Sequence, residues 1–210
     1  LADISLRALA TLRTSDLIVC EDTRVTAKIK SAFAITTPLL CYNDHNASKT
    51  LPKIMELLQK GKIISLVSDA GTPTISDPGY KLVNSAIQER ILVTSVPGAS
   101  AMLAALTTSG LPTDRFLFLG FLPTREAAKQ KTLKALNEFK ATLIFYESAK
   151  RLSATVKTMA DVLDPRPAVI ARELTKKYEE FWRGDLTALA LKTSREREKK
   201  GEFVILLGPP

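Results

Sequence analysis

The sequence predicts an α/β protein of two domains, the first with a mainly parallel sheet covered by helices on both faces and the second with a mixed sheet. Through the first half, short apolar segments alternate with segments that are apolar at helical spacing, as in doubly wound sheets. Near Pro112 this pattern gives way to aromatic-rich strands and a segment suited to antiparallel pairing. We therefore expect domains over residues 1–112 and 113–210.

The expected elements of the first domain alternate regularly. A helix over 5–12, with Asp3 as its N-cap, should precede buried strands over 17–20, 39–42, 63–67 and 91–96. The helices between and after these strands are expected over 25–33, 51–60 with Thr50 as N-cap, 78–87 with Asp77 as N-cap, and 99–108. A helix followed by a strand is the second half of a β-α-β unit, so we expect a first strand that precedes Leu1.

The second domain should contain strands over 116–121, 142–146, 167–171, 178–183 and 202–207. The segment 178–183 is expected to pair antiparallel, Asp185 to cap a short helix, and residues 195–200 to form a charged turn. A further helix interleaves Lys129, Lys131, Lys134 and Lys140 with apolar residues. This face fits phosphate contact, but a solvated helix face is the favoured interpretation.

The most informative segment is IISLVSDAGTPTISDPGY, residues 63–80. Its buried strand is followed by a loop of about ten small and polar residues, longer than the roughly two to six that are usual for such a connection. Gly71 lets the backbone approach a ligand closely, and Asp69 can accept hydrogen bonds from a hydroxyl or an amine. Open α/β sheets bind ligands at the carboxyl ends of their strands, so we favour a binding site over a plain connection whose Asp and Ser residues cap turns.

Polar residues follow other expected strands as well. Glu21–Arg24 forms either the edge of a site or a helix cap around Asp22. His45, the one histidine of the chain, lies in the polar segment Asn43–Asn46, and both a structural and a functional role are open for it. Pro97–Ala101 opens a helix of small residues, whose N-terminus can receive a ligand or simply pack closely on the sheet.

Composition narrows the class of protein. The formal charge of +8 favours a polyanionic partner such as RNA, although a generically basic enzyme has the same balance. No apolar segment approaches the roughly 18–20 residues that span a membrane. One histidine and two separated cysteines, Cys20 and Cys41, give no metal-ligand set, and the cysteines are interpreted as buried thiols of a cytoplasmic protein.

Several motifs, in order along the chain, closely resemble those of the small-subunit ribosomal RNA methyltransferase I family, a branch of the tetrapyrrole methylase class. They are SDAGTPTISDPGY (68–80), VPGASA (96–101), GLPTDRFLFLGFLP (110–123), FYES (145–148) and ARELTK (171–176). Glu21–Arg24 and the Asn43–Asn46 segment also fit the pattern, so the resemblance covers essentially the whole chain. Relative to it, a first strand with a Pro- and Gly-containing loop before Leu1 and a helical tail after Pro210 are missing.

The resemblance implies a two-domain tetrapyrrole methylase-like fold, a homodimer, S-adenosylmethionine as methyl donor, and a cytidine 2′-hydroxyl of 16S ribosomal RNA in the 30S subunit as acceptor. It implies that Asp69, Ala70 and Thr72 lie in one cofactor segment and Ser100 and Ala101 in a second. Tyr146 and Glu147 are implied to contact the methionine part of the cofactor, and Leu174 and Thr175 to close over its adenine.

Methyl transfer from a sulfonium chiefly requires alignment of donor and acceptor, and a base can assist loss of the hydroxyl proton. We predict His45 and Asp22 as base or orienting groups, and Arg24 as a contact to RNA phosphate. Glu21, Glu147, Arg172 and Glu173, which also lie at expected strand ends, are further candidates, and Arg172 could contact RNA phosphate as well. Two alternatives stay open: C-methylation of a tetrapyrrole, which shares the fold, and an RNA-binding module without catalysis.

Overall fold

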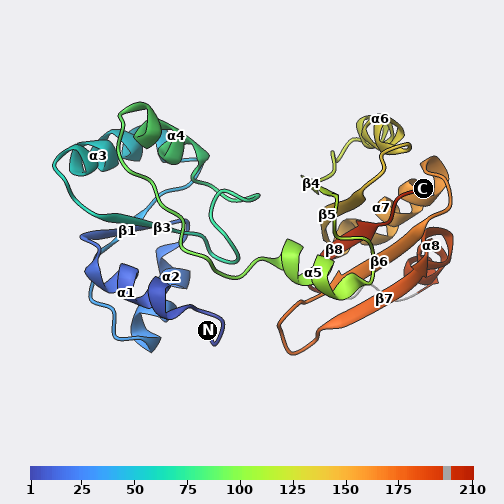
Figure 1. Ribbon diagram of the computed structural model, residues 1–210, viewed down its shortest axis with the longest axis horizontal. Coiled ribbons are helices and arrows are strands. Elements are labelled where there is room, and N and C mark those ends of the chain that lie inside the picture. The colour runs from blue at the N-terminus through green and yellow to red at the C-terminus, as the bar shows by residue number, and fades with distance from the viewer. Residues whose placement is uncertain (196–199) are drawn as a thin grey trace. The chain divides into compact units, whose positions relative to one another are not determined.

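The computed structural model describes residues 1–195 and 200–210 and divides into two compact units, Leu1–Ser100 and Ala101–Pro210 (Figure 1). The division lies before helix α5 (Ala101–Ser109), whereas the sequence placed it near Pro112. The reason is packing, because Ala105 and Leu106 of α5 belong to a buried cluster of the second sheet. Each unit is described by itself below.

The first unit contains a three-stranded parallel sheet in the order β2-β1-β3. Its strands are β1 (Leu17–Cys20), β2 (Leu39–Cys41) and β3 (Ile64–Val67), and its helices are α1 (Leu6–Thr14), α2 (Thr23–Ala32), α3 (Ala47–Gln59) and α4 (Tyr80–Gln88). Neighbouring residues of β1 point to opposite faces. Val19 packs against residues of α3 and α4, and Ile18 packs against residues of α1 and α2. Helices on both faces of a parallel sheet confirm the predicted class.

The second unit contains a mixed sheet in the order β4-β5-β8-β6-β7. Its strands are β4 (Phe116–Phe121), β5 (Thr142–Ser148), β6 (Pro167–Arg172), β7 (Glu180–Asp185) and β8 (Glu202–Leu207), and its other helices are α6 (Glu126–Leu136), α7 (Ala149–Val162) and α8 (Leu186–Arg195). β4 and β5 are parallel, and the remaining pairs are antiparallel. β4, β5 and β6 therefore run in one direction and end at the same edge of the sheet.

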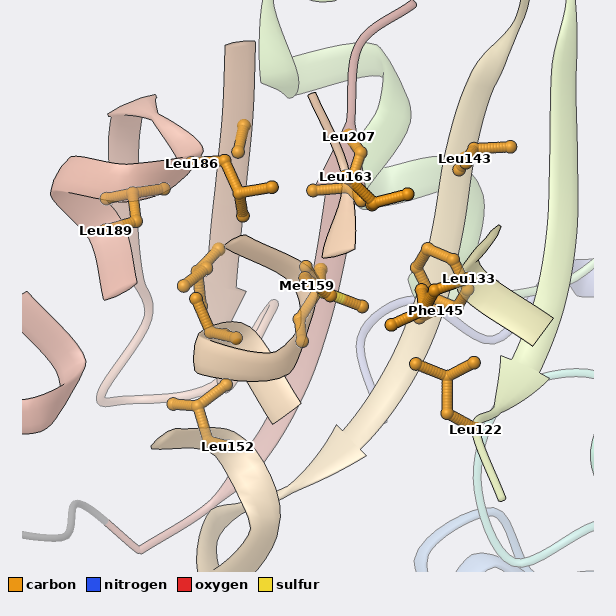
Figure 2. Packing of buried hydrophobic residues seen from close by; sticks show 14 of the residues in the cluster. Leu122, Leu133, Leu143, Phe145, Leu152, Met159, Leu163, Leu186, Leu189 and Leu207 are labelled. Carbon is orange, nitrogen blue, oxygen red and sulfur yellow. The ribbon is translucent and has the colours of Figure 1, made fainter. Parts of the chain in front are cut away.

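The two faces of this sheet are covered differently. Leu143 and Phe145 pack on Leu152 and Met159 of α7, within a cluster that also includes residues of α6 and α8 (Figure 2). Ile144 points to the opposite face, which α5 covers. This alternation along β5 is the two-residue period of a strand buried on both sides.

One expected strand is absent from the described residues. Residues 91–96 form no ladder, and Leu92 and Val93 are 87% and 43% exposed. β3 pairs with β1 on one side, and no described strand lies along its other edge. The apolar character of residues 91–96 therefore does not by itself place this segment in the sheet.

Three predicted N-caps are wrong by two or more residues. Ser5, rather than Asp3, caps α1 by accepting a hydrogen bond from the Ala8 amide at 3.1 Å. α3 begins after Asn46 instead of Thr50, and α4 after Gly79 instead of Asp77. A Cβ on Gly79 would lie 2.7 Å from Leu66 Cδ2, so this glycine, at φ +131°, fixes where the chain turns into the helix.

The expected cap at Asp185 is confirmed, because its carboxylate accepts a hydrogen bond from the Thr187 amide at 2.8 Å. The expected charged turn over 195–200 falls largely on residues 196–199, outside the described residues. Among the helices of the described ranges, none combines the length and the apolar character that a membrane span requires.

Candidate functional site at the strand ends

Three polar segments lie at the carboxyl edge of the first sheet because its strands are parallel. Glu21–Arg24 follows β1, Asn43–Asn46 follows β2, and Ser68–Thr72 follows β3. The Asp22 amide donates a hydrogen bond to Asp69 Oδ1 at 3.1 Å, which joins the first of these segments to the third. The structure thus brings together a predicted catalytic residue and a predicted cofactor residue that are 47 positions apart.

Asp22 caps α2 and is paired with Arg24. Its carboxylate accepts hydrogen bonds from the Arg24 amide at 2.8 Å and from the Arg24 guanidinium at 2.5 and 3.0 Å. These hydrogen bonds lower the pKa of Asp22 to about 2 from the ordinary 3.8. A carboxylate with such a low pKa is a weak proton acceptor at neutral pH. The guanidinium side chain of Arg24 remains 88% exposed.

Glu21, at the same edge of the sheet, has a raised pKa, in contrast to Asp22. Partial burial raises its pKa above the ordinary 4.5, and the negative charges of Asp69, Asp77 and Asp44 raise it further. The Cys41 thiol donates to the Glu21 carbonyl at 3.1 Å and ties this residue to the end of β2. Glu21 is one of the candidates that its place at a strand end predicts, and it lies directly after β1, the central strand of the parallel sheet.

His45 lies on an exposed turn that two asparagines organise. The His45 amide donates to Asn43 Oδ1 at 3.1 Å, the Asn43 amide donates to Asn46 Oδ1 at 2.9 Å, and Asn46 Nδ2 donates to the Cys41 carbonyl at 3.0 Å. The imidazole is therefore carried on a loop whose backbone is fixed to the end of β2.

The loop after β3 is folded by its own side chains. The buried Ser68 hydroxyl donates to the Ala70 carbonyl at 3.0 Å, and the Thr72 hydroxyl donates to the Ala99 carbonyl at 2.9 Å. The latter contact joins the two predicted cofactor segments, Asp69–Thr72 and Ser100–Ala101, one residue before Ser100. Gly71 has φ +69°, and apart from its chain neighbours no atom of the described residues lies within 4 Å of the position of a Cβ there. This arrangement suits a ligand recognised through the main chain.

In the second unit, the predicted residues lie at the carboxyl ends of β5 and β6. Tyr146 and Leu174 both pack against the cluster on the α5 face. Thr175 follows with φ +62°, and its amide donates to Glu179 Oε2 at 2.6 Å. Tyr146 of β5 and Ala171 of β6 each pair with Val204 of β8, so they are level across the sheet.

Glu147 points away from this group. Its side chain is 1% exposed and accepts hydrogen bonds from the Thr155 hydroxyl at 2.7 Å and the Ser148 amide at 2.8 Å. Arg151 Nε lies 3.3 Å from the same carboxylate. The Glu147 side chain thus ties β5 to α7, and the structure does not bring it to the Tyr146 face. Its predicted contact with a cofactor stays a prediction.

A metal site is not formed, since no three His, Cys, Asp or Glu side chains in residues 1–195 and 200–210 are placed to hold an ion. Arg172 is engaged within the second unit, where its guanidinium donates to the Lys200 carbonyl at 2.8 and 3.0 Å.

The comparisons with known proteins agree on one family. The family model of the tetrapyrrole (corrin/porphyrin) methylases matches residues 1–190. A protein of Mesorhizobium japonicum named ribosomal RNA small subunit methyltransferase I is 48% identical over 100% of this chain and 71% of its own length. A protein of the same name from Halalkalibacterium halodurans is 47% identical over 99% of this chain and 71% of its own.

Solved structures share the fold at low identity. Diphthine synthase aligns with a TM-score of 0.75 at 16% identity, covering 99% of this chain and 85% of that one. Uroporphyrin-III C-methyltransferase of Thermus thermophilus, solved in complex with S-adenosylhomocysteine, aligns with a TM-score of 0.64 at 18% identity, covering 98% and 91%.

Proposed function

This chain belongs to the tetrapyrrole (corrin/porphyrin) methylase family, and from that premise we propose that it methylates the 2′-hydroxyl of a cytidine in 16S ribosomal RNA, using S-adenosylmethionine. The observation that carries the proposal is the likeness, at 47–48% identity over nearly the whole chain, to proteins named ribosomal RNA small subunit methyltransferase I. The formal charge of +8 agrees with an RNA substrate.

S-adenosylmethionine supplies a methyl group that is already activated on a sulfonium. The described residues fit such a ligand, because a sulfonium and an ammonium are cationic and the carboxyl edge of the first sheet carries carboxylates. Asp69, Ala70, Thr72 and the Ser100–Ala101 segment are proposed to hold it in the first unit and at the start of α5. The lack of any atom of non-adjacent residues in 1–195 and 200–210 within 4 Å of a Cβ position on Gly71 supports close approach of a ligand to the main chain.

In the second unit, Tyr146, Glu147, Leu174 and Thr175 are proposed to complete the cofactor site. Tyr146 and Ala171 are level across the sheet and separated by two strand spacings, about 10 Å. An elongated ligand can therefore contact Tyr146 at one end and the Leu174–Thr175 loop at the other. Because the Glu147 carboxylate is buried, we propose that it holds the end of β5 in place.

The chain's own contribution to the reaction is alignment and proton transfer. Holding the 2′-hydroxyl in line with the donor lowers the entropic cost of transfer. We propose that His45 and Asp22 orient the acceptor, that Arg24 contacts an RNA phosphate, and that Glu21 is a further candidate for proton acceptance, since its pKa is raised while that of Asp22 is lowered. A homodimer and a cytoplasmic location are parts of the same proposal.

The test is transfer of a tritiated methyl group from S-adenosylmethionine to 30S subunits and to naked 16S RNA, followed by nuclease mapping. We expect label in a 2′-O-methylcytidine of the RNA. Transfer to a tetrapyrrole with none to either RNA would replace the proposal with C-methylation, for which the uroporphyrin-III C-methyltransferase structure at 18% identity argues only through the fold. Calorimetry showing no binding of S-adenosylmethionine would favour an RNA-binding module without catalysis.

A further inference from the structure

Three aromatic side chains lie together at the carboxyl ends of β4 and β5, and we call Phe118, Phe121 and Tyr146 the aromatic ledge. The Tyr146 ring meets Phe118 at a centroid distance of 4.8 Å and an interplanar angle of 67°. It meets Phe121 at 5.9 Å and 65°. Phe118 and Tyr146 pack on the core beneath α5, whereas Phe121 is 54% exposed.

A β-bulge places Phe121 on this face. Residues three apart in a regular strand point to opposite faces, so Phe118 and Phe121 would be separated. In β4 the register shifts between Phe118, which pairs with Ile144, and Gly120, which pairs with Phe145. Gly120 has φ +63°, the left-handed conformation that glycine adopts without strain. As a result Phe121 pairs with Tyr146 and shares its face.

The core does not require an exposed phenylalanine here. β4 is an edge strand that pairs only with β5 among the described strands, and Phe121 belongs to none of the buried clusters. The local backbone is bent by a bulge and a positive-φ glycine, and the outcome is a large ring half in solvent. Exposed aromatic rings supported from the side are the surfaces on which single-stranded nucleic acids stack their bases.

We propose that the aromatic ledge stacks an unpaired nucleobase of the RNA substrate on Phe121, an inference that rests on the proposed function. Two arginines are close to Phe121 through the backbone that follows it, and arginines are the usual contacts to RNA phosphate. The Arg151 guanidinium donates to the carbonyl of Leu122 at 2.6 Å, directly after Phe121, while also pairing with Glu147. Arg125 is exposed four residues further along the chain.

The position of the ledge favours substrate over the adenine of the cofactor. Phe121, Tyr146 and Ala171 are level across the sheet through their pairings. Phe121 lies three strand spacings from Ala171, about 14 Å, and the loop proposed to cover the adenine follows Ala171. Phe121 therefore lies outside the span from Ala171 to Tyr146, on the side of the residue proposed to contact the methionine part of the cofactor.

The test measures RNA binding and stacking directly. Phe121→Ala should weaken binding of a single-stranded 16S RNA fragment, followed by fluorescence anisotropy, by about tenfold or more. It should raise KM for 30S subunits while leaving the Kd for S-adenosylmethionine unchanged. The matched control is Phe116→Ala in the same strand, with a 42% exposed ring at the other end of β4, for which we expect less than about a twofold change.

A spectroscopic variant separates stacking from a general apolar contact. Phe121→Trp should retain binding, and its fluorescence should be quenched when RNA binds, whereas Phe116→Trp should not respond. Wild-type RNA affinity in Phe121→Ala, or a loss of S-adenosylmethionine affinity with RNA binding intact, overturns the proposal. If the wild-type protein methylates no RNA yet its RNA affinity depends on Phe121, the proposed function fails and the ledge stands.

Discussion

Removal of the Thr155 hydroxyl tests whether the buried Glu147 carboxylate depends on internal donors. Thr155→Val keeps the shape of the side chain, and Thr155 is 1% exposed, so water cannot replace the lost hydroxyl. That hydroxyl donates to Glu147 Oε2 at 2.7 Å. A hydrogen bond to a buried charged group contributes about 1.5–3 kcal/mol, and we expect the free energy of unfolding to fall by that amount.

The assay is urea unfolding followed by the fluorescence of Trp182, the one tryptophan of the chain, which is buried in the second unit. Thr158→Val in the same helix is the matched control. The Thr158 hydroxyl donates to Glu126 Oε1 at 2.6 Å, but the Glu126 side chain is 54% exposed and water can replace the donor. We expect a loss below about 1 kcal/mol there, and equal losses in the two variants would refute the reasoning.

Three further predictions concern the carboxyl edge of the first sheet. The pKa of Glu21 is raised in the folded protein, so its ionised form opposes folding and stability falls as pH rises through that pKa. Glu21→Gln should therefore raise the urea midpoint at about pH 8, and a lower midpoint would contradict this. The pKa of Asp22 is lowered in the folded protein, so the ionised carboxylate stabilises the fold fully above pH 3.8, and this stabilisation disappears as pH falls toward about 2. Asp22→Asn should therefore lower the urea midpoint near neutrality, by a difference that vanishes in acid. His45→Ala should lower the rate of methyl transfer and leave the stability unchanged, because His45 is exposed. Wild-type turnover in both His45→Ala and Asp22→Ala would show that neither residue takes part in catalysis.

Sequence patterns predicted the strands of both sheets better than the partners of those strands and the starts of the helices. Continuous apolar segments such as 142–146 identified buried strands, because such a strand needs no alternation. Residues 91–96 have the same pattern but no described neighbouring strand, and local sequence does not reveal whether a partner exists. Three N-caps were predicted wrongly for a related reason. Several polar residues precede these helices, and tertiary packing selects among them, as where Leu66 leaves no room for a Cβ on Gly79.

The burial of Lys129 could have been predicted from helical spacing, but the charge of the residue favoured an exposed position. The basic residues of α6 predict a solvated face, yet Lys129 is 4% exposed, and its ammonium lies 3.1 Å from the Glu126 carboxylate. Leu133 and Leu136 follow at positions i+4 and i+7, so helical spacing alone places Lys129 on the core side of α6. The bulge that positions Phe121 had no comparable signal beyond Gly120, because a register shift is a property of the strand pair.

Strand direction explains why separate segments of the second unit can serve one site. β8 lies between β5 and β6 and runs antiparallel to both, so β5 and β6 keep a common direction. Phe121, Tyr146 and the loop after Arg172 consequently lie at one edge of the sheet, although each is at least 25 positions along the chain from the next. β8 reaches this place by a crossover, because β7 and β8 are both antiparallel to β6 and α8 connects them. The antiparallel insertion thus preserves the alignment of the strand ends on which the proposed site depends.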